Sequence, residues 1–208
     1  MAENLKDIFT FFNENLDLSK KSLLISLASI VFNPTAWNII ARNEHHNKTI
    51  TRLCGNNPRY GCYLLAALIF GFGLFRDSLY HRALADQPTA TLLPQPYATY
   101  VPIGLFGLGQ LFVITSTWAL GFTGTFLGDY FGILMDHRVT CFPFNILNDP
   151  MYVGSTLCFL ATALWYEKPA GLLITLFVWR VYAAALNYEG PFTTMIYEQR
   201  AKTAKKSS

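Results

Sequence analysis

The stretch that decides the fold is YVPIGLFGLGQLFVITSTWALGF, residues 100–122. It holds no charged side chain, and none occurs anywhere between Asp86 and Asp129. A helix needs about 20 apolar residues to cross the hydrocarbon layer of a bilayer, and this run provides them. The sequence therefore predicts a transmembrane helix here and an integral membrane protein around it.

The composition of the 208 residues agrees with a lipid environment. Only 14% of them are charged and 52% are hydrophobic, with a mean hydropathy of +0.27, whereas soluble domains average about 25% charged residues. The net charge of +3 is too small and too dispersed to indicate nucleic-acid binding. The four cysteines form no C-x-x-C pair and no ligand-spaced set with histidine. We therefore expect neither a metal site nor a disulfide framework.

Four more apolar runs flank this helix. They are residues 22–41, 60–80, 151–166 and 170–188. Asn33-Pro34 interrupts the first, which either crosses with a kink or dips into the membrane and returns. The second spans if Arg76 reaches an interface near Asp77. We expect an all-α integral membrane protein with four to five membrane helices, built as one domain over residues 1–208.

Only Glu167-Lys168-Pro169 separates the last two runs, which indicates the turn of an antiparallel helical hairpin. Arg180, inside its second arm, is either a functional group or a partnered or snorkelling one. Residues 1–21 carry apolar side chains at helical spacing. This predicts an amphipathic helix on the membrane surface, or a helix that packs on the domain. Residues 195–208 form a basic tail.

The positive-inside tendency agrees with five crossings and a cytosolic C-terminus. The last four residues, Lys205-Lys206-Ser207-Ser208, have the form of a dilysine retrieval signal of the endoplasmic reticulum. A basic tail that meets anionic lipid is the alternative interpretation. A mitochondrial membrane is an alternative location, and nothing in the sequence indicates an oligomer.

The polar segment GFTGTFLGDYFGILMDHRVTCFPFNILNDPMYVGST, residues 121–156, is rich in reactive side chains. It carries Asp129, Asp136, His137, Arg138, Asn145 and Asp149 in a chain otherwise poor in charge. Connections of this length are usually functional or disordered, and its aromatic residues argue against disorder. Two other candidates are Gly104-x-x-Gly107-Leu108-Gly109, which could instead serve helix packing, and Tyr188-Glu189-Gly190-Pro191.

Several blocks of this chain resemble the phospholipid methyltransferase family. They are Phe32-Asn33-Pro34, Trp37-Asn38, Ala41-Arg42, Leu105 to Gln110, Gly124 to Gly132, Arg138 to Asn145, Pro150 to Ser155 and Glu189 to Thr193. The resemblance implies an S-adenosylmethionine-dependent transfer of methyl groups to the amine of an ethanolamine phospholipid. In its narrower form it implies that phosphatidyl-N-methylethanolamine and phosphatidyl-N,N-dimethylethanolamine are converted to phosphatidylcholine.

The family's cofactor motifs match Gly107-Leu108-Gly109 and Glu189-Gly190. The family has a second glutamate where this chain has Gly190, which weakens any mechanism that needs both carboxylates. Pro150-x-Tyr152-x-Gly154 is also similar to the cofactor-side motif of isoprenylcysteine carboxyl methyltransferases, whose fold includes a similar hairpin. Methylation of a prenylated cysteine is therefore an alternative activity. A small lipid transporter or scaffold is the non-enzymatic alternative.

Methyl transfer to an amine requires a nitrogen lone pair, so some group must accept a proton. The candidates for this acceptor are Asp129, His137 and Glu189, and Tyr152 is a further catalytic candidate. The aromatic faces expected at the substrate ammonium are Tyr130, Phe131 and Tyr152, with interfacial anchoring as their alternative role. Arg138 is the cation expected at the lipid phosphate.

Overall fold

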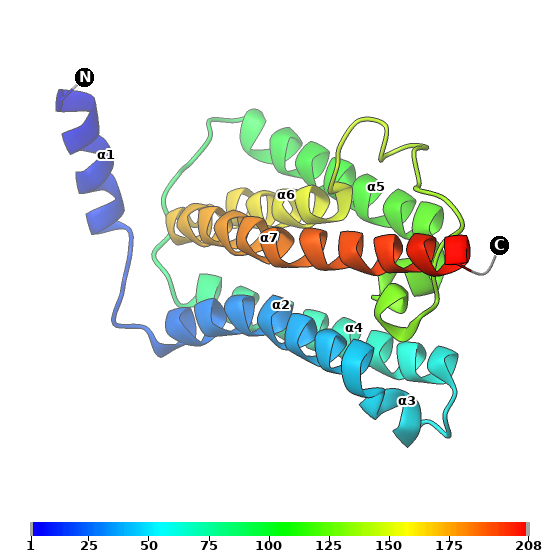
Figure 1. Cartoon of the computed structure of the whole chain (residues 1–208). Helices are drawn as coiled ribbons and strands as arrows, with labels where there is room; N and C mark the ends of the chain where they lie inside the picture. The colour runs from blue at the N-terminus through cyan, green and yellow to red at the C-terminus, as the bar shows by residue number, and fades with distance from the viewer. Residues whose placement is uncertain (1, 207–208) are drawn as a thin grey trace. The chain divides into compact units, whose positions relative to one another are not determined.

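The computed structural model describes residues 2–206, and within this range every regular element is a helix (Figure 1). In chain order the elements are α1 (Ala2–Glu14), α2 (Lys21–Asn47), α3 (Thr49–Leu53), α4 (Pro58–Ala85), α5 (Tyr97–Thr125), the 3₁₀ turn η1 (Gly128–Phe131), α6 (Pro150–Trp165) and α7 (Pro169–Lys206). The predicted all-α class is confirmed.

Within residues 2–206, four of the helices are long and apolar enough to cross a membrane. The candidate spans are Lys21–Asn47, Pro58–Ala85, Tyr97–Phe131 and Pro169–Thr203, and α6 is a shorter apolar helix of 16 residues. The chain is therefore a multi-pass membrane protein. Helix α6 and the start of α7 form a hairpin whose turn consists of Tyr166, Glu167 and Lys168.

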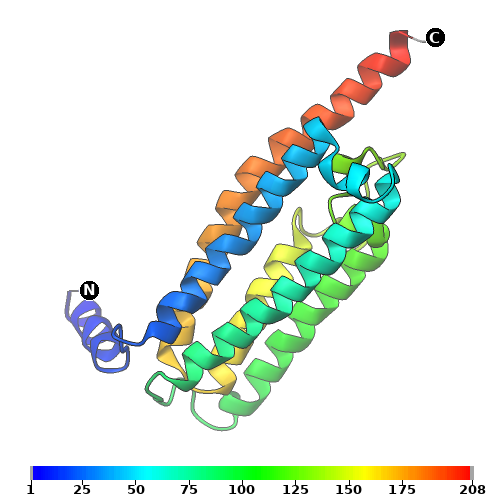
Figure 2. The ribbon, with the colours of Figure 1, turned by 90° about the horizontal axis from the view of Figure 1, so that it is seen from below.

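Three boundaries differ from those expected from the sequence. Helix α2 continues through Pro34 without a break, and α7 continues as one helix through the basic tail to Lys206 (Figure 2). The polar segment 121–156 is not one loop, because its first five residues form the end of α5, which kinks at Gly121 (φ 67°, ψ 175°), and its last seven begin α6. The connection that carries the polar side chains is therefore residues 126–149.

The chain divides into two compact units, and each long helix contributes to both. The first unit contains the residues up to Ile30 together with Leu74–Ile114 and Asp149–Arg180. Small residues bring the hairpin arms together here, since a Cβ on Gly171 would lie 2.5 Å from the Cβ of Ala163. The side chain of Lys168 donates to the Gln87 carbonyl at 2.6 Å and ties the hairpin turn to the segment after α4.

The second unit contains Val31–Gly73, Thr115–Asn148 and the residues from Val181 onward. The amide of Asn33 on α2 donates to the Phe72 carbonyl on α4 at 3.2 Å, and Trp37 meets the Phe72 ring edge-on. Pairing of a buried amide with a backbone carbonyl satisfies a polar group that lipid could not. This unit carries most of the polar side chains singled out in the sequence.

Candidate active site

Asp129 lies on η1, a short turn that two left-handed backbone positions delimit. Leu127 precedes the turn with φ 57° and Gly132 follows it with φ 81°. A Cβ on Gly128 would lie 2.6 Å from the carbonyl oxygen of Thr123, so only glycine fits there without displacing the end of α5. The glycines around Asp129 thus fold the chain back sharply after α5 and fix the position of the carboxylate.

The two aromatic residues after Asp129 point into the protein. Tyr130 is 0% exposed and packs with Ala41 and Ile196, and Phe131 is 2% exposed and packs in a second cluster around Trp37. The sequence predicts that Tyr130 and Phe131 offer their faces to a substrate ammonium group. Their burial instead makes them the anchors that hold η1 against the surrounding helices.

The neighbours of η1 on α7 are Glu189 and Thr193. Thr193 lies beside the Asp129 carboxylate, and Glu189 and Asp129 are both within electrostatic reach of the Tyr130 phenol. Residues 60 positions apart in the sequence are thereby gathered in one place. Of the predicted site residues, Asp129, Tyr130 and Glu189 come together.

Arg42 of α2 joins this group, although the sequence did not single it out as a functional residue. Its guanidinium carbon lies 4.7 Å from the centroid of the Phe192 ring and 6.0 Å from that of Tyr188. Its Nη2 donates to the Tyr188 carbonyl at 2.6 Å. The one hint in the sequence was that Arg42 and Phe192 both lie in blocks that resemble the methyltransferase family.

The rest of the polar connection lies at the surface. His137 and Arg138 are exposed, and within residues 2–206 neither side chain makes a hydrogen bond or an ion pair. The connection is held to α7 by a hydrogen bond from the Met135 amide to the Tyr197 hydroxyl at 3.2 Å. Asp149 directly precedes α6, and desolvation raises the pKa of its carboxyl above the ordinary value.

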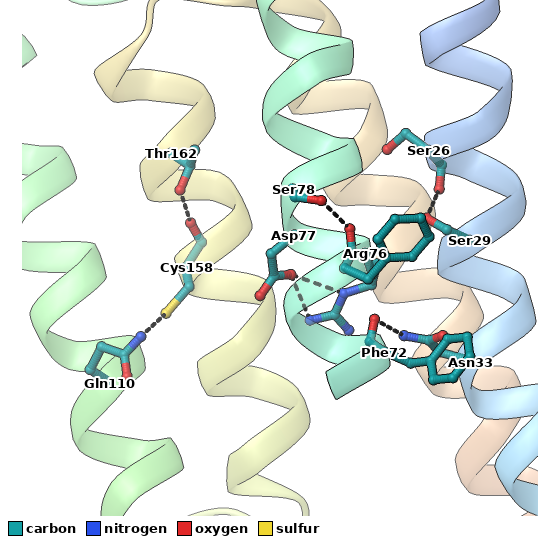
Figure 3. Close-up of polar contacts among 11 residues, drawn as sticks. Ser26, Ser29, Asn33, Phe72, Arg76, Asp77, Ser78, Gln110, Cys158 and Thr162 are labelled. Atoms are coloured by element: carbon teal, nitrogen blue, oxygen red, sulfur yellow. Dashed lines mark hydrogen bonds and ion pairs between the residues drawn. The ribbon is translucent and has the colours of Figure 1, made fainter. Parts of the chain in front are cut away.

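The glycine motif of α5 and the tyrosine motif of α6 belong to the first unit. Gly107 and Leu108 are exposed, whereas Gly109 is buried and a Cβ there would lie 2.6 Å from the Gly154 carbonyl oxygen. Next to Gly109, the Gln110 amide donates to the Cys158 sulfur at 3.6 Å (Figure 3). Gly109 thus serves a close contact between α5 and α6, while Gly107 leaves its backbone accessible.

Tyr152 lies in the first turn of α6, where its carbonyl accepts a hydrogen bond from the Thr156 hydroxyl. Gly190 lies on α7, and a Cβ there would meet no atom within 4 Å. Within the described range of the chain, no three His, Cys, Asp or Glu side chains are grouped as metal ligands. The assembled chemistry is therefore two carboxylates, a guanidinium and aromatic rings, which suits proton acceptance and the binding of charged groups.

Comparison with known proteins gives a consistent result. A sequence profile of the family described as phospholipid methyltransferase matches residues 97–200. The phosphatidyl-N-methylethanolamine N-methyltransferase of Neurospora crassa is 54% identical over 208 residues, which cover 100% of this chain and 95% of that protein. The enzyme of the same name from Saccharomyces cerevisiae is 48% identical and covers 99% of both chains.

Human phosphatidylethanolamine N-methyltransferase is also similar. It is 44% identical over 187 residues, which cover 90% of this chain and 94% of the human protein. No solved structure matches the chain.

Proposed function

Because the chain belongs to the phospholipid methyltransferase family, we propose that it methylates the amines of phosphatidyl-N-methylethanolamine and phosphatidyl-N,N-dimethylethanolamine to give phosphatidylcholine. The observation that carries this proposal is the 54% identity over the full chain to an enzyme named for the first of these lipids. The comparisons do not support the two alternative functions considered from the sequence, which are a prenylcysteine methyltransferase and a lipid transporter or scaffold.

We propose that the methyl donor is S-adenosylmethionine, which supplies a methyl group from its sulfonium when bound. Two separate sets of residues are the candidates to hold it: Gly107, Leu108 and Gly109 in the first unit, and Glu189 and Gly190 in the second. A Cβ at Gly107 or Gly190 would meet no atom within 4 Å. The backbone at both positions is therefore open to a ligand, which supports this assignment. Glu189 offers a carboxylate for an ammonium or hydroxyl group of the donor. Gly109 would act indirectly, through the packing of α5 on α6.

Asp129 is the proposed proton acceptor. A methylated ethanolamine headgroup is mostly protonated near neutral pH, so one proton must leave the nitrogen before its lone pair attacks the methyl carbon. Asp129 is held between Leu127 and Gly132 with Thr193 beside it, and a positioned base typically contributes about 10²–10⁴-fold to the rate. His137 is a weaker candidate because it lies exposed on the connection.

The location in the cell is also a proposal. Four candidate spans make the protein multi-pass, and the Lys205-Lys206-Ser207-Ser208 ending supports retention in the endoplasmic reticulum. The last two of these residues lie outside the described part of the structure. Localisation of the tagged chain, with Lys205 and Lys206 replaced by serine in a second version, tests the role of the ending.

The decisive experiment offers phosphatidylethanolamine and its monomethyl and dimethyl derivatives separately, with labelled S-adenosylmethionine and purified protein in vesicles. We expect the monomethyl and dimethyl lipids to be converted to phosphatidylcholine. Efficient conversion of the unmethylated lipid would refute the narrower substrate range. Label found only in protein carboxyl groups would refute lipid methylation.

A further inference from the structure

The ring of Phe192 on α7 is surrounded by polar side chains whose hydrogen bonding is incomplete. Tyr130 stacks on this ring at 5.2 Å between centroids, His45 meets it edge-on at 5.4 Å, and the Arg42 guanidinium lies 4.7 Å from its centroid. Three buried atoms of these side chains have no hydrogen-bond partner in the described part of the protein. They are the Nε of Arg42, the Nδ1 of His45 and the hydroxyl of Tyr130.

Unpaired polar atoms of this kind are rare, because most buried polar groups in proteins have a partner. Tyr130 is 0% exposed, so bulk water cannot complete the hydrogen bonding of its phenol. The side chain of Thr193 lies near the phenol and interacts with it. Three unsatisfied groups around one ring therefore point to a polar ligand that binds at this place.

The surroundings of Arg42 on α2 favour an anionic ligand. His45 and His46 follow it within one turn, and the Lys48 ammonium lies 3.4 Å from the Tyr130 carbonyl oxygen. Arg42 and Lys48 give this end of α2 a positive character, and the His45 and His46 rings add nitrogen atoms that can form hydrogen bonds.

The acidic residue of α2 does not neutralise this charge. Glu44 is 0% exposed, and its carboxylate accepts hydrogen bonds from the backbone amides of Ile50 and Thr51 and from the Thr51 hydroxyl. Its oxygens are thus committed to the junction between α2 and α3. Arg42 therefore does not pair with Glu44, and the carboxylates that lie with it around the Tyr130 phenol are Asp129 and Glu189.

Arg42 is also held in a fixed orientation. Its Nη2 donates to the Tyr188 carbonyl at an exposed position, and the rings of Tyr188 and Phe192 lie beside its guanidinium. A guanidinium fixed in this way matches the planar geometry of an oxyanion with two parallel hydrogen bonds, which a lysine ammonium does not.

We propose that Arg42 is the oxyanion-binding residue of the site, with the Tyr130 hydroxyl and the His45 ring completing the hydrogen bonds. This inference rests on the proposed function, whose two substrates each carry an oxyanion. One is the phosphodiester of the lipid and the other is the carboxylate of S-adenosylmethionine. Arg42 binds one of these groups and thereby positions that substrate near Asp129 and Glu189.

The test compares Arg42→Gln, Arg42→Lys and Arg138→Gln with the control Arg59→Gln, which alters an exposed arginine at the start of α4. The full-length proteins are assayed in vesicles, varying the monomethyl lipid at saturating donor and then the donor at saturating lipid. We expect Arg42→Gln to raise one KM by about 10- to 100-fold, the range of a lost hydrogen-bonded charge pair. We expect kcat to change little and Arg42→Lys to recover part of the affinity.

The substrate whose KM rises identifies the oxyanion: a higher lipid KM assigns the phosphodiester, and a higher donor KM assigns the carboxylate. If the unaltered protein and Arg59→Gln transfer methyl groups but Arg42→Gln keeps both KM values within about twofold, the inference is wrong. A fall in kcat alone also overturns it, since that result indicates a structural role. An unaltered protein without any methyl transfer refutes the proposed function itself.

A second variant covers the case in which Arg42→Gln does not fold. Tyr130→Phe removes only a buried hydroxyl that has no protein partner, so we expect its melting temperature to stay the same or rise. We expect Tyr130→Phe to raise the KM of one substrate, and this should be the same substrate whose KM is raised in Arg42→Lys. A lower melting temperature with both KM values unchanged would show that the hydroxyl serves the fold and binds no substrate, which overturns the inference.

Discussion

Replacement of Gly109 by alanine separates two roles that a G-x-G motif could have in this protein. A Cβ at position 109 would lie 2.6 Å from the carbonyl oxygen of Gly154, 2.7 Å from the Cys158 sulfur and 3.2 Å from the Cys158 nitrogen. Ordinary van der Waals contact begins near 3.4 Å. Two of these three atoms belong to the backbone of α6, so rotation of a side chain cannot relieve the clash, and the helices have to move apart.

The expected cost follows from this geometry. Insertion of a methyl group into a closely packed site typically costs about 1–3 kcal/mol, and alanine recovers up to about 1 kcal/mol through its higher helix propensity. The net loss is about 1–2 kcal/mol, which corresponds to roughly 2–8 °C in melting temperature for a chain of this size. Gly154→Ala should act in the same direction, because its Cβ would lie 2.5 Å from the Gly109 carbonyl oxygen.

The matched control is Gly107→Ala on the same helix. A Cβ at position 107 meets no atom within 4 Å, so this variant should melt at the same temperature as the unaltered protein or slightly higher. Thermal unfolding of the three purified variants in one detergent gives the comparison, and the KM for S-adenosylmethionine is measured on the same samples. We expect Gly107→Ala to raise that KM and Gly109→Ala to lower the melting temperature.

The reasoning would be refuted if Gly109→Ala melted with the unaltered protein. In that case the contact with Gly154 would not constrain the helices. A rise in the donor KM without loss of stability would show that Gly109 approaches the donor directly.

Three further substitutions test the site and its support. Asp129→Asn should reduce kcat by about 10²–10⁴-fold because it removes the proton acceptor. The control Asp136→Asn alters a side chain of the same connection that is 91% exposed, and it should leave kcat unchanged. Equal kcat values for the two variants would exclude Asp129 as the acceptor. Glu189→Gln should weaken the binding of S-adenosylmethionine, measured by isothermal titration calorimetry. The control Glu198→Gln, later on the same helix α7, should leave this binding unchanged. Unchanged binding in Glu189→Gln would remove Glu189 from the donor site. Glu44→Gln should destabilise the protein by about 1–3 kcal/mol, since it places an amide donor against backbone N–H groups; an unchanged thermal unfolding curve would contradict the role given to this carboxylate.

The spans and the hairpin could be predicted because the bilayer imposes a simple rule on sequence. Apolar runs near 20 residues cross the membrane, and a three-residue break with two charges and a proline between two such runs leaves room only for a turn. Pro34 was harder to interpret, because a proline removes one hydrogen bond whether the helix stops or continues. Neighbouring groups can satisfy the freed backbone in a membrane helix, and α2 continues.

The candidate site was predictable only in part, because its contacts join distant segments. Asp129 and Glu189 stood out as charges beside apolar runs, but nothing near Arg42 in the sequence indicates Phe192, which lies 150 residues later. The burial of Tyr130 likewise depends on Ala41 and Ile196 from two other helices. An aromatic residue in a polar segment looks the same in sequence whether it faces a substrate or packs into the interior.

The shortness of α6 has a consequence for the surrounding lipid. Its 16 residues extend about 24 Å along the helix axis, whereas the hydrocarbon layer of a typical bilayer is about 30 Å thick. Such hydrophobic mismatch is relieved when the bilayer thins locally, and it favours membranes that are thinner on average, as that of the endoplasmic reticulum is. A thinned bilayer beside α6 would place the lipid headgroups closer to the middle of the membrane. Because acyl-chain length sets the thickness of the bilayer, the reaction rate would then depend on acyl-chain length even where the headgroup is unchanged.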